Sequence, residues 1–144
     1  MAKVVCELLS AQAEMEPDLP GVDSSAGAIL DFRGVVRGLE NGREIQGIDY
    51  EAHETMAQSQ LEHIANATAE KFRLRRVLIR HRIGFVAAGD VSLLVRLISA
   101  HRGESLEAMV WLIDELKKKV PIWKHPRFGG AENLAASAAA EVAR

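Results

Sequence analysis

The sequence is very poor in cysteine. Its 144 residues include one cysteine, Cys6, so neither an internal disulfide nor a cysteine-based metal cluster can form within one chain. A lone thiol fits a reducing compartment, and the cytoplasm is the expected location. No metal is expected, because the five histidines include no pair at metal-binding spacing with carboxylate or cysteine support. No cofactor is expected either.

Long apolar runs and nucleotide-binding motifs are also missing. The run Val4-Val5-Cys6 is broken by Glu7, which is too early for a signal peptide, and no stretch approaches the length of a membrane span. Neither a Gly-x-Gly-x-x-Gly nor a Walker sequence follows a predicted strand, and no serine elbow is recognisable. Dinucleotide chemistry and serine hydrolase chemistry are therefore not supported.

Neither charge nor aromatic content indicates a nucleic-acid partner. The net charge is −2, and charged residues make up 26% of the chain, as in ordinary globular proteins. An RNA-binding alternative would rest on one basic cluster, Arg73, Arg75, Arg76, Arg80 and Arg82, but the aromatic content is only 5% and no aromatics interleave with these arginines. The length fits a single domain over residues 1–144. We expect no nucleic acid and no membrane as partners.

Hydrophobic periodicity predicts an α+β domain with a mainly antiparallel sheet. Alternating or continuous apolar residues predict strands at 3–9, 76–84 and 91–99, and helical spacing predicts amphipathic helices at 53–72 and 101–119. The pair Asn41-Gly42 is a strong hairpin signal, so we expect one β-hairpin from Ala28 to Tyr50.

Lys117 is the least expected residue of the second helix. The predicted apolar stripe consists of Leu106, Met109, Val110, Ile113, Leu116 and Val120. At about 100° per residue, Lys117 falls near the middle of this stripe. Its ammonium either lies over apolar surface with its head in water or serves a pocket.

Further cations occur at positions suited to an anion. His101 and Arg102 stand where a strand leads into a helix, and helix N-termini favour anions; the alternative is a histidine that only caps the helix. Arg33 and Arg37 lie on one face of the strand predicted from Gly27 to Arg37. Their alternative role is a charged, solvated sheet edge.

Several short blocks together resemble a known family over roughly residues 27–124. The blocks occur in this order: Phe32-Arg33-Gly34-Val35-Val36-Arg37, Tyr50-Glu51-Ala52 with Met56-Ala57, His81-Arg82-Ile83-Gly84, Gly89-Asp90, Ser99-Ala100-His101-Arg102, Leu116-Lys117 and Pro121-Ile122-Trp123-Lys124. Their order and spacing resemble the large, catalytic subunit of molybdopterin synthase.

The resemblance implies an α/β hammerhead-type fold and a sulfurtransferase. The substrate would be cyclic pyranopterin monophosphate, which receives two sulfurs to form the dithiolene of molybdopterin. The donor would be the thiocarboxylated Gly-Gly C-terminus of a small ubiquitin-like subunit, and the large subunits would form a homodimer within a heterotetramer. The Gly129-Gly130 pair of this chain is internal, so a second protein must supply the sulfur.

The resemblance also assigns the site residues. Lys117 and Lys124 would be catalytic, with Lys117 as general acid or base, whereas Phe32, Arg37, His101 and Arg102 would bind substrate. After Lys124 the chain departs from the family, and residues 128–144 form a divergent tail. The family's basic tail residue would have to be replaced by Arg127, just before this tail, or by Arg144 at its end. The alternative is a non-catalytic paralogue that binds the pterin phosphate or the small subunit without turnover, but both lysines are retained.

Overall fold

The computed structural model describes residues 2–17, 24–129 and 141–142. Its elements follow the chain in the order β1 (Lys3–Ser10), β2 (Ala28–Val35), β3 (Leu39–Glu40), β4 (Arg43–Glu44), β5 (Gly47–Ala52), α1 (Glu54–Phe72), β6 (Arg76–Ala87), β7 (Val91–Ser99), α2 (Arg102–Lys119), β8 (Ile122–Arg127) and β9 (Glu141–Val142). The predicted α+β class and mainly antiparallel sheet are confirmed. No helix in the described part of the chain is long and apolar enough to cross a membrane.

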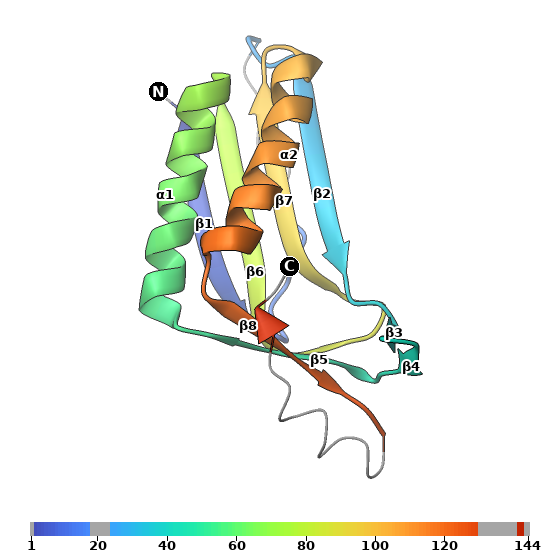
Figure 1. The fold of residues 1–144 in the computed structure, drawn as a ribbon. Coiled ribbons are helices and arrows are strands. Elements are labelled where there is room, and N and C mark those ends of the chain that lie inside the picture. Colours follow the sequence, from blue (N-terminus) through green and yellow to red (C-terminus); the bar gives the residue numbers. More distant parts are fainter. Residues whose placement is uncertain (1, 18–23, 130–140, 143–144) are drawn as a thin grey trace.

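The main sheet is bent, and β6 belongs to both of its halves. The strand order is β2-β7-β6-β5-β8-β9, with β1 added in parallel along β6 from Arg76 to Ile83. β6 pairs with β7 up to His81 and with β5 from Gly84 onward. Gly84 has a φ of +101°, which a side chain would strain. Beyond this glycine, β5 and β8 cross below the two helices (Figure 1).

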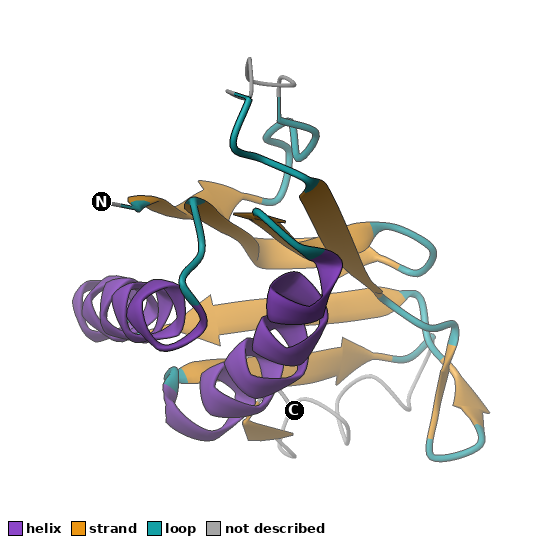
Figure 2. Ribbon diagram, turned by 90° about the horizontal axis from the view of Figure 1, so that it is seen from above, coloured by secondary structure: helices purple, strands orange, loops and turns teal. Residues whose placement is uncertain are grey.

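Both helices cover the same face of the sheet (Figure 2), where they bury its apolar side chains. α1 packs on β1 and β6, whereas α2 packs on β2 and β7. α1 begins after His53, whose Nδ1 accepts a hydrogen bond from the Met56 amide at 3.2 Å, and it ends at Arg73 in the left-handed conformation. β7 lies between β2 and β6, which explains why its residues are almost all buried.

The predicted long hairpin from Ala28 to Tyr50 is wrong. Asn41 and Gly42 have positive φ values of 52° and 78°, but their turn joins only β3 and β4. β2 pairs with β7 instead, and β5 pairs with β6 and β8. The turn signal is local, whereas the partner of β2 is decided by burial of its apolar face under α2.

The predicted buried stripe of α2 is also partly wrong. The buried residues are Ser105, Ala108, Met109, Leu112 and Leu116. Leu106 and Val110, by contrast, are 53% and 67% exposed, and Lys117 is exposed beside Leu116. The small side chains of Ser105 and Ala108 face the sheet, and the Ser105 hydroxyl lies 2.5 Å from that of Ser99. Apolar spacing alone favoured the larger residues one position away.

Candidate functional site

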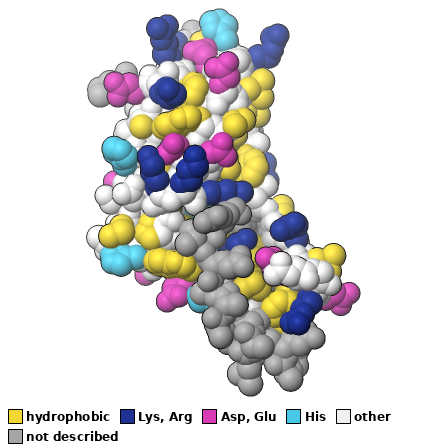
Figure 3. Space-filling model, viewed as in Figure 1, with side chains coloured by type: hydrophobic (Ala, Val, Ile, Leu, Met, Phe, Trp, Pro, Cys, Tyr) yellow, Lys and Arg dark blue, Asp and Glu magenta, His cyan; other side chains and the backbone are white. Residues whose placement is uncertain are grey.

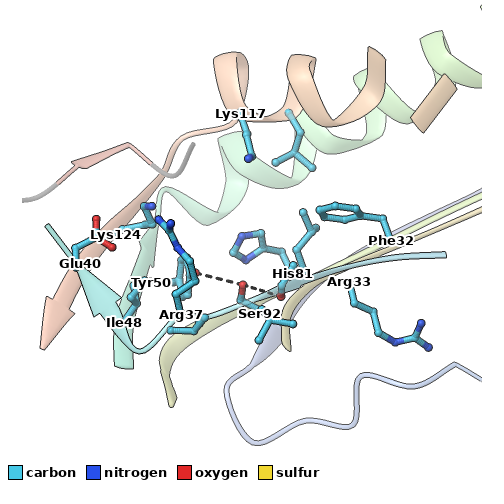
Figure 4. Close-up of a pocket in the computed structure, with 15 residues that line it drawn as sticks. Phe32, Arg33, Arg37, Glu40, Ile48, Tyr50, His81, Ser92, Lys117 and Lys124 are labelled. Atoms are coloured by element: carbon cyan, nitrogen blue, oxygen red, sulfur yellow. Dashed lines mark hydrogen bonds between the residues drawn. The ribbon is translucent and has the colours of Figure 1, made fainter. Parts of the chain in front are cut away.

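A cavity of about 350 Å³ lies between the C-terminal end of α2, the end of β2 and strand β8. Four residues expected at the site line it together, namely Phe32, Arg37, Lys117 and Lys124 (Figure 4). They come from β2, the segment after it, the last turn of α2, and β8. The volume is in the range of small-molecule sites.

A tight corner between α2 and β8 brings the two lysines together. The Val120 amide donates to the Leu116 carbonyl at 3.1 Å, which closes the helix, and β8 begins two residues later. On β8, Lys124 pairs with Tyr50 of β5, so the central strand β5 sets its position. The lysine side chains thus reach the cavity from two elements.

The cavity carries an excess of positive charge. Among the described residues, Arg37, Lys117 and Lys124 form no ion pair, and Glu40 is the one carboxylate that lines the cavity with them. Three cations with one carboxylate favour an anionic ligand. Arg33 is not part of this set: its guanidinium lies 2.7 Å from Glu16 and points away from the cavity in Figure 4.

Buried polar residues form the floor of the cavity, and the sequence did not identify them as site residues. The Tyr50 hydroxyl donates to the Ser92 hydroxyl at 3.2 Å, and Ser92 donates to the Gly34 carbonyl at 3.4 Å. Burial raises the pKa of Tyr50. The ring of His81 stands edge-on to that of Tyr50, with centroids 5.1 Å apart.

His81 is a neutral imidazole. Burial lowers its pKa to about 4, and its Nδ1 lies 2.7 Å from the Arg82 carbonyl oxygen. Because a carbonyl only accepts hydrogen bonds, Nδ1 carries the proton and Nε2 is left as an acceptor. The cavity floor therefore adds no positive charge at neutral pH.

The buried imidazole predicts a loss of stability in mild acid. The unfolded imidazole binds a proton below about pH 6.5, whereas the folded one resists protonation until about pH 4, so the unfolded state binds more protons in this window. The free energy of unfolding is expected to fall by about 3 kcal/mol across it. Urea unfolding at several pH values measures this loss.

A matched variant separates His81 from the carboxylates. His81→Asn keeps a donor toward the Arg82 carbonyl but cannot titrate, so its loss over the same window should be smaller by about that amount. Hydrogen bonding to Arg96 lowers the pKa of Asp31, so the stability that this carboxylate contributes is lost only as the pH falls below its ordinary pKa of 3.8. Equal pH dependence in wild type and His81→Asn would contradict this assignment.

His101 and Arg102 do not reach the cavity of their own chain. They stand at the other end of α2, and Arg102 is about 22 Å along the helix from Lys117. The His101 side chain is 85% exposed, with Nδ1 3.2 Å from Glu104 Oε1. Of the basic residues that the resemblance assigns to the site, Arg37, Lys117 and Lys124 thus line the cavity of one chain, whereas His101 and Arg102 do not.

Two other candidates are accounted for elsewhere in the structure. Burial raises the pKa of the Cys6 thiol to about 12, so it is protonated at neutral pH and is a poor sulfur carrier. Arg127 pairs with Asp49 and lies 4.6 Å from the centre of the Phe85 ring. Arg144 and most of the divergent tail lie outside the described residues.

Comparisons with known proteins found similar sequences and similar solved structures. A family model described as "MoaE protein" matches residues 6–119. A relative from Pyrococcus abyssi, named molybdopterin synthase catalytic subunit, is 42% identical over 70% of this chain and 68% of its own length. The Homo sapiens protein of the same name is 38% identical over 68% of this chain, which spans about half (52%) of that protein.

Two solved structures share the fold. Molybdopterin synthase from Staphylococcus aureus superposes with a TM-score of 0.71 at 27% identity, covering 90% of this chain and 93% of that one. A structure described as a complex of subunits 1 and 2 of molybdopterin-converting factor from Helicobacter pylori 26695 superposes with a TM-score of 0.62 at 26% identity, covering 71% and 66%.

Proposed function

Because this chain belongs to the MoaE family, whose named relatives are catalytic subunits of molybdopterin synthase, we propose that its cavity is the site of sulfur transfer. Sulfur passes from the thiocarboxylated C-terminus of a small ubiquitin-like subunit to cyclic pyranopterin monophosphate, and the product is the molybdopterin dithiolene. The convergence of Lys117, Lys124 and Arg37, all without ion pairs in the described chain, is the observation that carries this proposal.

Four residues that line the cavity have a role in this proposal. Lys117 transfers protons as general acid or base, because it projects into the cavity from the end of α2. Arg37 and Lys124 bind the cyclic phosphate and stabilise charge that develops on oxygen as sulfur attacks. Phe32 offers a flat apolar surface to the pterin ring.

We further propose that a second copy of the chain supplies His101 and Arg102. The exposed Leu106 and Val110 lie on the free side of α2, and hydrophobic side chains gather over this helix in Figure 3. Arg102 and Lys117 stand at nearly equal distances on either side of Val110. If two α2 helices pack antiparallel about a twofold axis near Val110, Arg102 of one copy lies beside Lys117 of the other.

The sequence alone points to the apolar strand Val91–Ser99 and the sheet edges as surfaces for self-association. The structure does not make that strand available, because it is β7, which lies inside the sheet and is buried. Its apolar residues are already buried within the chain. The exposed apolar residues of α2 are available instead.

The variant Val110→Asp is expected to produce a monomer. Two aspartates would face each other near the twofold axis, and burying them unpaired should weaken the dimer by about 100-fold or more. Light scattering measures the mass, which is 15.8 kDa for one chain. Met56→Asp is the control, because Met56 is 51% exposed on α1. A wild-type monomer, or an unaffected Val110→Asp dimer, would rule out this interface.

The sulfur donor is proposed to be a small subunit whose C-terminal tail enters the cavity. The Helicobacter pylori structure is described as a complex of two subunits of that protein, which supports a two-subunit assembly here. Two large and two small subunits would then form a heterotetramer.

Reconstitution tests the proposed function directly. Purified protein is mixed with a thiocarboxylated small subunit and cyclic pyranopterin monophosphate, and molybdopterin is measured as its fluorescent oxidation product. Formation of molybdopterin is the expected result. Binding of the precursor or the small subunit without product would instead identify a non-catalytic paralogue.

A further inference from the structure

A second cavity lies on the face of the sheet opposite the helices. It has a volume of about 240 Å³, and its walls are formed by β1, β6, β7 and Pro17. Its charged lining residues are Lys3, Glu7, Arg76, Arg80 and Arg96. None of these residues lines the cavity that contains Lys117.

Strand register arranges these side chains in three rows across one face. Side chains at paired positions of neighbouring strands point to the same face. The first row holds Lys3, Arg76, Ile98 and Ile29; the second holds Val5, Leu78, Arg96 and Asp31; the third holds Glu7, Arg80, Leu94 and Arg33. Apolar and basic side chains thus alternate within a small area.

The second and third rows carry their own carboxylates. Arg96 forms a bidentate salt bridge with Asp31, in which Nε and Nη2 each donate to one carboxylate oxygen at 2.7 Å. Arg80 lies 3.4 Å from Glu7, and Arg33 lies 2.7 Å from Glu16. Charge in these rows is therefore balanced within the chain.

The first row has no carboxylate. Among the described residues, neither the Lys3 ammonium nor the Arg76 guanidinium forms an ion pair. Their neighbour in the row is the apolar Ile98, and Val5 and Leu78 follow in the next row. This end of the cavity thus combines two free cations with an apolar floor.

Arg96 adds a buried donor to the same cavity. This residue is 7% exposed, and its Nη1 has no hydrogen-bond partner in the described part of the chain. Native structures rarely leave a buried N–H unpaired, because it has lost its hydration without replacement. A bound ligand with a hydrogen-bond acceptor would give this N–H a partner.

We propose that this cavity binds a small organic anion. Its carboxylate or phosphate group is held between Lys3 and Arg76 within reach of Arg96, and a short apolar part lies on Val5 and Leu78. The site is independent of the sulfur-transfer cavity, because the sheet separates the two.

Titration of ¹⁵N-labelled protein, with inorganic phosphate in one series and butyrate in another, tests this site. Saturable shifts are expected for the backbone amides of Val5, Leu78 and Ile98 with at least one of these anions. The anion that binds identifies the head group. The amides of Tyr50 and Ser92 report separately on the other cavity, so failure at one site is distinguishable from failure at the other.

Two neighbouring arginines provide the variant and its control. Arg76→Gln should weaken binding at Val5, Leu78 and Ile98 about tenfold or more, because it removes a charge-assisted hydrogen bond. Arg75→Gln removes the same charge one residue away, from an exposed side chain outside the cavity, and should change binding by less than about twofold. Absence of saturable shifts with both anions, or equal effects of the two variants, would overturn the proposal.

Discussion

Replacing Lys117 by alanine is expected to lower molybdopterin formation by about 10²–10⁴-fold while the protein stays folded. Lys117 is exposed and makes no ion pair among the described residues. Its loss should therefore change the free energy of unfolding by no more than about 0.5 kcal/mol. The reconstituted reaction and urea unfolding measure the two effects.

Lys118 is the matched control for this experiment. It is an exposed lysine in the same helical turn, but it does not line the cavity. Lys118→Ala removes the same charge from the helix end but leaves the lining of the cavity unchanged, so it should retain nearly full activity. Equal losses in both variants would mean that general positive charge at the end of α2, rather than proton transfer by Lys117, supports the reaction.

Mixing two inactive variants is expected to restore activity if two copies share each site. Lys117→Ala and Arg102→Ala are purified separately and allowed to exchange subunits. In a mixed dimer, one site receives both defects and the other receives neither, so about a quarter of all sites should be intact at equal amounts. Activity should rise from near zero toward that fraction.

The mixing experiment also has a result that contradicts the shared site. If Arg102 acts only within its own chain, every site in the mixture lacks one residue and activity stays near zero. If Arg102→Ala is fully active alone, this residue does not bind substrate. Mass spectrometry of intact dimers verifies that subunits have exchanged.

Elements with a strong local pattern could be predicted from the sequence. Apolar residues repeat at the helical period in α1 and α2 and at strand spacing in β6 and β7. The predicted positions of these four elements are therefore close to the observed ones. The pairing of β2 with β7 could not be predicted, because it joins residues far apart in the chain. The Asn41-Gly42 turn indicated a hairpin but not its length.

The candidate site was predictable where a charged residue interrupts an apolar pattern or belongs to a recognisable block. Arg37, Lys117 and Lys124 are examples, and the structure brings them together. His81 was not predicted as a site residue, because its place in the alternating β6 pattern is typical of a core position. Its role on the cavity floor depends on β5, which brings Tyr50 beside it.

Because the corner between α2 and β8 is short, the number of residues between Lys117 and Lys124 must stay fixed for both side chains to reach the cavity. Side chains of a strand alternate between its two faces, so a slip of one residue reverses them all. Inserting one residue next to Pro121 would shift β8 along β5 and turn Lys124 to the opposite face, with a neighbour such as Trp123 in its place. Evolution can therefore substitute residues in this corner more easily than it can lengthen it.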